Sequence, residues 1–317
     1  MLKIGFPLPT KEHELRRALL PEDLEGIAQP AGIVFENDYG RIMGYDDDAY
    51  RAAGATVAER RAVCDCPIIC CAKPMLTDEY FQDGKIIFGW IHAVQGRQMT
   101  DLLVQNRMTA IAWEDMFEGG RHSFWRNNEI AGEAAVMHAF MQWGRLPYEH
   151  RVAVIGRGNV ARGALRILER FGCQVMVYDR KTSHLLRKEI GRFDIVVNAV
   201  LWDVFRDDHL IYEQDLAKMK PGGLIIDISC DEGMGVETSR ATSMDEPVYW
   251  CQGILHYVVD HTPTLYYRSA SESISKVVAR FVDCLLEQRS DPAIDEATII
   301  RAGEILDNRI LRFQDRK

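Results

Sequence analysis

Two side chains suited to proton transfer or charge stabilisation each follow a short, mostly apolar run in the first third of the chain. Lys73 comes after the run 68–72, and His92 comes shortly after the run 85–89. A lysine can stabilise negative charge that develops on an oxygen, and a histidine can transfer a proton near neutral pH. Because buried parallel strands end at one edge of a sheet, we expect both side chains to face one crevice. Taken singly, Lys73 has the alternative of a charge that ends a strand, and His92 that of a structural histidine.

A second candidate site is the glycine motif in VAVIGRGNVARGALRILERFGCQVMVYDRK, residues 152–181. The order strand, glycine turn, helix, strand is that of a dinucleotide-binding unit. Gly156 permits the tight turn, Gly158 lets a pyrophosphate approach the backbone, and Ala161 allows close packing of the helix on the strand. A glycine turn that binds nothing is the alternative, and the acid at position 179 favours the binding site. The predicted cofactor-binding residues are Gly156, Arg157, Gly158, Asn159, Val160, Ala161, Asp179, Arg180, Lys181, Thr182, Asn198, Ala199 and Val200.

The residues after the second strand of this motif leave the choice between NAD and NADP open. Asp179 would accept hydrogen bonds from the adenosine ribose, which favours NAD. Arg180, Lys181 and Thr182 follow at once and could bind a 2′-phosphate, which favours NADP. The sequence therefore predicts a nicotinamide dinucleotide of either kind.

A further acid lies beyond a later predicted strand. The strand 224–228 is followed by Ser-Cys-Asp, which places Asp231 near the predicted cofactor crevice. It is a candidate functional group, with a loop acid or a helix N-cap as the alternative. His122, His138 and His256 have no comparable context, and we predict that they are structural.

The elements that must position these residues alternate along the chain between short apolar runs and amphipathic helical patterns, which is typical of α/β folds. The predicted strands are residues 2–6, 33–36, 68–72, 85–89, 109–112, 152–155, 174–178, 194–198 and 224–228. The predicted helices are residues 21–28, 46–53, 97–105, 129–143, 160–171, 271–286 and 292–312.

These elements predict an α/β protein with two Rossmann-like, doubly wound domains and mainly parallel sheets. Residues 1–128 and 270–317 would form a discontinuous substrate domain, and residues 129–269 the dinucleotide-binding Rossmann domain. The active site is expected in the cleft between the domains, where closure would exclude water.

The stretch CDCPIICCAKPM, residues 64–75, holds four of the eight cysteines and raises the question of a metal site. Zinc sites use pairs of cysteines with a second pair or histidines further along, and no histidine lies near this stretch. Free cysteine also packs as a small hydrophobic residue. We therefore predict a buried strand with reduced thiols and no metal.

The composition and charge of the chain limit the kinds of partner that the protein can have. The 317 residues are 47% hydrophobic and carry a net charge of −9, which argues against nucleic acid as a partner. No apolar run reaches the ~18 residues that suggest a membrane span, and the start does not resemble a secretory signal. We expect a cytoplasmic protein that acts on small molecules.

Over nearly its whole length the chain resembles the alanine dehydrogenase and transhydrogenase-type family, and within it most closely the N5-(carboxyethyl)ornithine synthases. The segment ELRRALLP resembles the one whose arginine, here Arg16, holds the substrate carboxylate. AKP resembles the strand end with the substrate lysine, Lys73, and FGWIH the one with the catalytic histidine, His92. DISCDEG resembles the segment whose second aspartate, here Asp231, lies beside substrate and nicotinamide.

Three stretches resemble the synthases in particular: residues 156–163, 178–182 and 262–268. Two positions depart from the patterns. Cys71 stands where alanine dehydrogenases have the first lysine of a Lys-x-Lys-Glu-Pro run, and Asp179 stands where the synthases have a neutral aromatic residue. The second departure puts a strict preference for NADP in doubt.

The resemblance implies reductive condensation of pyruvate, a 2-oxo acid, with the side-chain amino group of ornithine or lysine, and a homo-oligomer. Arg16 and Lys73 would bind the substrate, while His92, Lys73 and Asp231 would be catalytic. Arg268 is a candidate for the carboxylate of the second substrate, with loop packing as its alternative. Two other functions are weighed: an amino-acid dehydrogenase that uses ammonia, and a regulatory protein that binds NAD(P) without catalysis.

Overall fold

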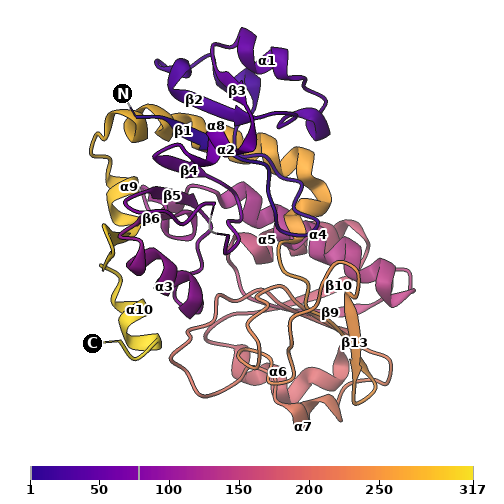
Figure 1. The fold of residues 1–317 in the computed structure, drawn as a ribbon. Helices are drawn as coiled ribbons and strands as arrows, with labels where there is room; N and C mark the ends of the chain where they lie inside the picture. The colour runs from indigo at the N-terminus through magenta and orange to yellow at the C-terminus, as the bar shows by residue number, and fades with distance from the viewer. Residues whose placement is uncertain (1, 78, 317) are drawn as a thin grey trace. The chain divides into compact units, whose positions relative to one another are not determined.

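The computed structural model describes residues 2–77 and 79–316. The chain forms two compact units, Met1–Trp125 with Tyr267–Lys317, and Arg126–Tyr266 (Figure 1). The first unit is thus built from two separate parts of the chain. The boundaries predicted from sequence lie a few residues further along the chain. The assignment of substrate binding to one unit and dinucleotide binding to the other remains a prediction.

An eight-stranded sheet is the centre of the first unit, in the order β16-β15-β6-β5-β4-β1-β2-β3. Its strands are β1 (Ile4–Phe6), β2 (Ile33–Glu36), β3 (Thr56–Ala58), β4 (Ile68–Cys70), β5 (Ile86–Gly89), β6 (Thr109–Ala112), β15 (Thr298–Arg301) and β16 (Glu304–Ile305). The strands β1 to β6 pair in parallel, whereas β15 pairs antiparallel with both β6 and β16. Strands β7 (Phe117–Glu118) and β8 (Arg121–His122) form a separate small hairpin.

The helices of this unit connect most of its parallel strands or belong to its C-terminal part. They are η1 (Pro21–Asp23), η2 (Pro30–Gly32), η3 (Arg41–Met43), α1 (Asp47–Ala52), α2 (Arg60–Cys64), α3 (Arg97–Gln105), η4 (Trp113–Asp115), α8 (Tyr267–Glu287), α9 (Pro292–Glu296) and α10 (Asn308–Phe313). Helix α8 contributes an apolar face to the core on one side of the sheet.

The cysteine-rich stretch belongs to this core. In β4, Ile68 and Cys70 point into the apolar cluster on one face, and Ile69 points into the cluster on the other. All four cysteines of residues 64–71 are buried and unpaired. Within the described residues they do not gather as a metal-binding group. The interpretation as a buried strand is confirmed, although β4 ends two residues before the predicted 72.

The second unit is a six-stranded sheet in the order β10-β9-β11-β12-β14-β13. Its strands are β9 (Arg151–Ile155), β10 (Gln174–Tyr178), β11 (Ile195–Asn198), β12 (Leu224–Asp227), β13 (Val248–Cys251) and β14 (Ile254–Tyr257). Only β13 pairs antiparallel among these strands. Its helices are α4 (Trp125–Trp143), which starts at the last residue of the first unit, α5 (Asn159–Arg170), α6 (Ser183–Glu189), η5 (Ile190–Arg192), α7 (Glu213–Leu216) and η6 (Thr262–Tyr266).

Strand β9 lies between β10 and β11, so the strand order reverses at its end. Ligands bind at such switch points in doubly wound sheets, outside the carboxyl ends of the strands. Val152 and Val154 of β9 pack in the core on one face of the sheet, and Ala153 and Ile155 pack on the other. This burial on both faces explains why β9 is a continuous apolar run in the sequence. The predicted α/β class with two mainly parallel sheets is confirmed.

Two predicted helices are wrong. Residues 292–312 form α9, the hairpin β15–β16 and α10 instead of one helix. The β-branched run Thr298–Ile300 favours a strand, and Gly303 in the left-handed region (φ +85°) makes the turn of the hairpin. Residues 21–28 form only the short helix η1. No helix of residues 2–77 and 79–316 is long and apolar enough to cross a membrane.

Candidate active site

The glycine turn between β9 and α5 has the geometry of a phosphate-binding loop. Gly156 has φ +117°, and a Cβ there would lie 2.7 Å from the carbonyl oxygen of Ala199. A Cβ on Gly158, the N-cap of α5, would meet no atom within 4 Å. The first helical hydrogen bond of α5 runs from the N–H of Arg162 to the carbonyl of Gly158, at 2.9 Å. The first N–H groups of α5, which make no helical hydrogen bond, therefore lie beside open space. The residues of this turn fit the diphosphate of a dinucleotide.

The predicted adenosine end of the site lies at the carboxyl end of β10. One carboxylate oxygen of Asp179 accepts hydrogen bonds from the N–H groups of Lys181 (3.0 Å) and Thr182 (3.2 Å) and from the Thr182 hydroxyl (3.0 Å). The other oxygen lies 3.2 Å from Nε of Arg157 in the glycine turn. These hydrogen bonds, that of Thr182 foremost, hold the pKa of Asp179 below its usual range. One oxygen of Asp179 thus holds the turn after β10 through hydrogen bonds, and the other pairs with Arg157 of the glycine turn.

Helix α5 is fixed by a very close crossing with α4. A Cβ on Gly163 of α5 would lie 1.9 Å from the carbonyl oxygen of Glu129, and one on Gly132 of α4 would lie 2.0 Å from that of Val160. Neither position tolerates a side chain without a shift of the backbone. The crossing therefore sets the position of the first turn of α5, where the predicted diphosphate site lies.

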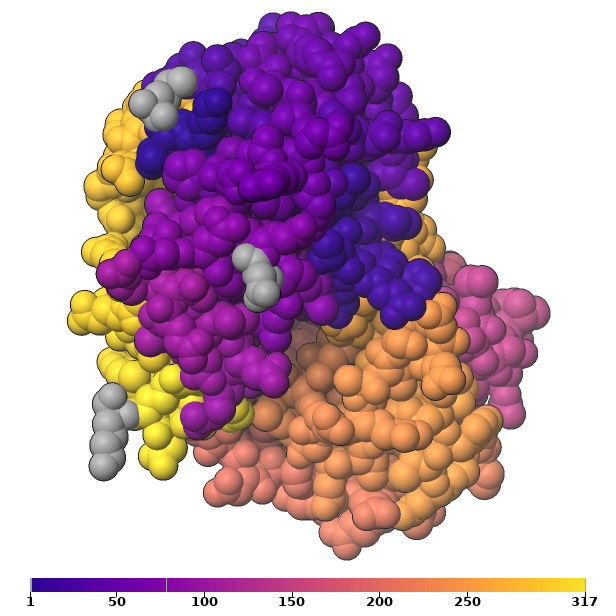
Figure 2. Space-filling model, in the orientation of Figure 1, coloured from indigo at the N-terminus to yellow at the C-terminus, as the bar shows by residue number. Residues whose placement is uncertain are grey.

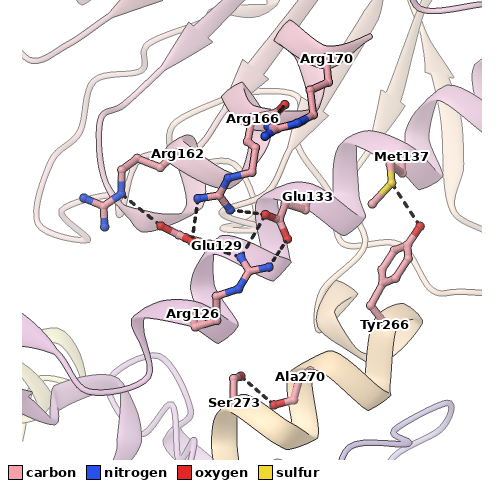
Figure 3. A network of polar contacts seen from close by, with 10 residues as sticks. All are labelled: Arg126, Glu129, Glu133, Met137, Arg162, Arg166, Arg170, Tyr266, Ala270 and Ser273. Atoms are coloured by element: carbon pink, nitrogen blue, oxygen red, sulfur yellow. Dashed lines mark hydrogen bonds and ion pairs between the residues drawn. The ribbon is translucent and has the colours of Figure 1, made fainter.

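A network of charged side chains flanks this crossing (Figure 3). The carboxylate of Glu129 pairs with Arg126 (3.1 Å), Arg162 (3.4 Å) and Arg166 (3.1 Å). Glu133 pairs with Arg126 (2.9 Å) and with Arg166. Burial alone would raise the pKa of Glu133, but the hydrogen bonds from Arg126 and Arg166 outweigh it and the pKa lies below its usual range. These ion pairs tie α5 to α4, and no motif in the sequence pointed to them.

The ends of β11 and β12 form a second polar cluster in the same unit. Asn198 donates a hydrogen bond to the carboxylate of Asp227 (2.9 Å), which also accepts one from the hydroxyl of Ser239. Burial raises the pKa of Asp227, against the lowering effect of these hydrogen bonds. Asp231 is partly buried, and its pKa is raised to about 6 by loss of water and then by the charge of Asp227. Asp231 can therefore gain and lose a proton close to neutral pH.

In the first unit, Arg16 is not the solvated surface charge that its sequence context alone would give. It is 3% exposed. Its Nε and Nη2 donate to the two carboxylate oxygens of Glu14, at 2.8 and 2.5 Å. The guanidinium also lies over the ring of Trp90, 4.9 Å from the ring centroid. These contacts fix the orientation of the guanidinium, whose planar fork of N–H groups is the geometry that binds carboxylates.

Lys73 and His92 line one cavity of about 490 Å³ in the first unit, together with Trp90. The full lining is Lys73, Pro74, Met75, Leu76, Trp90, Ile91, His92, Gln95, Gly96, Arg97, Gln98 and Met99. Trp90 is therefore shared between this cavity and Arg16. Lys73 and His92 thus share one cavity, whereas Arg16 is not among the residues that line it and is connected to it only through Trp90; the roles of all three remain predictions.

Two other predicted residues lie elsewhere. Asp231 belongs to the second unit, and Arg268 lies at the start of α8 with its guanidinium 5.8 Å from the ring of Tyr267. Arg268 is not among the residues that line the cavity of Lys73 and His92. Its proposed contact with a second substrate remains a prediction.

Three residues near the cavity were missed in the sequence: Glu14, Trp90 and Glu114. Glu14 and Trp90 are two residues from Arg16 and His92, and Glu114 follows the end of β6. An acid after a strand end was the signal that pointed to Asp231, and it applies equally to Glu114. The contacts of Trp90 and Glu114 join distant segments of the chain, so sequence spacing did not reveal them, whereas Glu14 binds Arg16 two residues away.

Comparison with known proteins places the chain among dehydrogenases. The family described as Alanine dehydrogenase/PNT, N-terminal domain, matches residues 5–124, and the corresponding C-terminal domain matches residues 179–309. The NAD binding domain of D-isomer specific 2-hydroxyacid dehydrogenase matches residues 122–234.

Several relatives are similar over most of their length. The N(5)-(carboxyethyl)ornithine synthase of Clostridium botulinum is 32% identical, over 89% of this chain and 94% of its own. The synthase of Lactococcus lactis subsp. lactis is 29% identical, over 89% and 96%. The alanine dehydrogenase of Bacillus subtilis is 26% identical, over 95% and 90%.

Solved structures share the fold. An L-alanine dehydrogenase superposes with a TM-score of 0.83 at 21% identity and covers 99% of both chains. A transhydrogenase from Sinorhizobium meliloti has a TM-score of 0.79 at 17% identity, over 96% and 99% of the two chains. The chain belongs to the alanine dehydrogenase/PNT family, as a dehydrogenase-type oxidoreductase with a nicotinamide dinucleotide as its cofactor.

Proposed function

We propose that the chain condenses pyruvate reductively with the side-chain amino group of ornithine, or of lysine, to give N5-(1-carboxyethyl)ornithine or its lysine counterpart. NADPH or NADH would be the reductant. The observation that carries this proposal is the 32% identity to a synthase of this name over 94% of that protein. The cavity that Lys73 and His92 share supports it, because the chemistry needs a cation and a proton carrier on one substrate.

Substrate binding is assigned to Arg16 and Lys73. Arg16 would bind the carboxylate of pyruvate, since its guanidinium is held in place by Glu14 and by the face of Trp90. Lys73 would lie against the oxo group, where its positive charge favours attack on the carbon and stabilises the oxygen that becomes negative. Arg268 would bind the α-carboxylate of the amino acid.

His92 is assigned the proton transfers. The neutral side-chain amine attacks the oxo carbon and forms a carbinolamine. His92 would then give a proton to the hydroxyl group, which leaves as water and produces a protonated imine. When bound, the reduced nicotinamide supplies the hydride that turns this imine into a secondary amine. Asp231, with a pKa of about 6, would be largely ionised at neutral pH and would balance the positive charge of the imine.

The substrate test compares the amines. Oxidation of NADPH and of NADH is followed with pyruvate plus ornithine, pyruvate plus lysine, and pyruvate plus ammonium. The proposal predicts turnover with ornithine or lysine and little with ammonium. Turnover with ammonium alone would identify an amino-acid dehydrogenase, the function named for the relative from Bacillus subtilis. Binding of the dinucleotide without turnover of any of these pairs would favour a regulatory protein.

We also expect a homo-oligomer, as the family resemblance implies, and a cytoplasmic location, as the sequence analysis predicts. Light scattering coupled to size-exclusion chromatography gives the mass of the assembly directly. A mass equal to that of one chain at micromolar concentration would contradict this expectation.

A further inference from the structure

The loop after β5 holds His92 in a backbone conformation that needs support. His92 has φ +52°, in the left-handed region that residues with side chains rarely adopt. Glu114 of η4 supplies that support, since one carboxylate oxygen accepts the N–H of Ile91 at 3.1 Å and the other accepts the N–H of His92 at 2.6 Å. Each oxygen of one carboxylate therefore holds one amide of this loop.

The next residues of the loop are held by a neutral side chain. Gln314, buried near the C-terminus, donates to the carbonyl oxygens of Ala93 (2.7 Å) and Val94 (3.1 Å). Thr100 of α3 also donates to Ala93, at 3.0 Å. The C-terminal segment, yellow in Figure 2, lies beside the purple part of the first unit that includes α3. The loop is thus fixed at both ends, by a carboxylate at His92 and by an amide beyond it.

We propose that Glu114 is a positioning residue for His92: its carboxylate accepts the amide hydrogens of residues 91 and 92 and thereby fixes the direction of the imidazole. This inference rests on the proposed role of His92 in proton transfer. Glu114 does not line the cavity that holds Lys73 and His92, so it acts through the backbone of His92.

The charge of Glu114 determines how well it holds the loop. An ionised carboxylate has two acceptor oxygens for two amides, whereas protonation turns one oxygen into a donor that faces an N–H group. Burial raises the pKa of Glu114 to about 7. Support for the His92 backbone is therefore complete above that pH and weakens as the pH falls through it.

Two other titratable groups, Asp115 and His122, lie next to Glu114. The neighbouring Asp115 has its charge balanced by Arg309 of α10, at 2.6 Å. His122 of β8 lies 3.2 Å from the backbone oxygen of Glu114 through Nε2. Burial lowers the pKa of His122, so this ring is neutral when Glu114 titrates.

The test pairs two isosteric substitutions on the same turn. Glu114→Gln replaces one acceptor oxygen by an NH₂ group that cannot accept an amide hydrogen. Asp115→Asn is the matched control. It removes one negative charge and the ion pair with Arg309, while the hydrogen bonds to the amides of residues 91 and 92 come from Glu114. Hydrogen exchange of the amides of residues 91 and 92, followed by NMR, reports the hydrogen bonds directly and needs no substrate. Steady-state kinetics report kcat and the KM for the dinucleotide.

Glu114→Gln is expected to lose exchange protection at residues 91 and 92 and to lower kcat about 100-fold, with an unchanged KM for the dinucleotide. Asp115→Asn is expected to keep both the protection and kcat. The inference is overturned if Glu114→Gln keeps the kcat of the wild type, if it keeps full protection at both amides, or if the two variants behave alike.

If Glu114→Gln does not fold, the pH dependence of amide exchange in the wild-type protein tests the inference. Protection of the amides of residues 91 and 92, corrected for intrinsic exchange, is expected to fall between about pH 8 and about pH 6. Protection that does not change over this range would contradict the inference. If pyruvate and ornithine are not turned over, the proposed function fails, while the exchange data at residues 91 and 92 still decide whether Glu114 holds the loop.

Discussion

The two candidate binding regions both lie after the carboxyl ends of parallel strands, but they are built differently. The glycine turn of the second unit offers backbone N–H groups and open space, and its position depends on a helix crossing that leaves no room for a Cβ at Gly163. The first unit offers side chains, two of which are held by an acidic partner: His92 of the cavity by Glu114, and Arg16, which lies outside the lining of the cavity, by Glu14. We therefore expect substitutions in the second unit to act through steric conflict, and substitutions in the first unit to lower the rate of the reaction.

The largest effect is expected for His92→Ala. Loss of a positioned proton carrier should lower kcat about 1,000-fold. The dissociation constant of NADPH, measured by fluorescence titration, should stay that of the wild type, because the predicted dinucleotide site belongs to the second unit. An active His92→Ala variant, or one that no longer binds NADPH, would remove the distinction between the two regions.

Two glycine substitutions separate packing from ligand binding within the second unit. Gly163→Ala places a Cβ against the carbonyl of Glu129 and should lower the free energy of unfolding in urea by about 3 kcal/mol. Gly158→Ala meets only open space, so stability should stay close to that of the wild type while the affinity for NADPH falls. If Gly158→Ala leaves that affinity unchanged, the glycine turn is not the diphosphate site.

The smallest expected effect concerns the charge on Asp231. Its pKa is raised to about 6, so the folded chain binds this proton more tightly than the unfolded chain, whose value is about 3.9. The resulting contribution to stability is complete below about pH 4 and is lost as the pH rises through about 6. Asp231→Asn should thus be more stable than the wild type at about pH 8, by about 1–2 kcal/mol in urea denaturation, and the difference should vanish near pH 4.

Asp179→Asn provides a control of opposite sign for Asp231→Asn. The pKa of Asp179 lies below its usual range, so its ionised form stabilises the folded chain above the unfolded pKa. Asp179→Asn should therefore be less stable than the wild type near neutral pH. Equal pH dependence of the two variants would contradict the environments described for these acids.

The strand ends and the glycine turn could be predicted from sequence because their signals are local. The motif at Gly156 and the apolar run before Lys73 each lie within about ten residues, and periodicity and turn chemistry determine such segments. The strand β15 was missed because β-branched residues inside a helical pattern acquire their role from pairing with β6, about 190 residues earlier in the chain.

The supporting acids could not be predicted for the same reason. Glu114 acts on His92 across two loops, and Glu129 and Glu133 act on arginines of a different helix. The sequence suggested candidates for ligand contact, which remain predictions, but not the groups that hold these candidates in place. The exception is Glu14, which lies two residues before Arg16 and appeared only as part of a family segment.

The most direct test of the central claim is to identify the product by mass spectrometry, with ornithine labelled with heavy nitrogen in its side chain. Pyruvate, labelled ornithine, unlabelled ammonium and NADPH or NADH are predicted to give a secondary amine that retains the label and both carboxylates, with loss of one water and oxidation of one dinucleotide. Unlabelled alanine formed from ammonium, with ornithine left unchanged, would contradict the account.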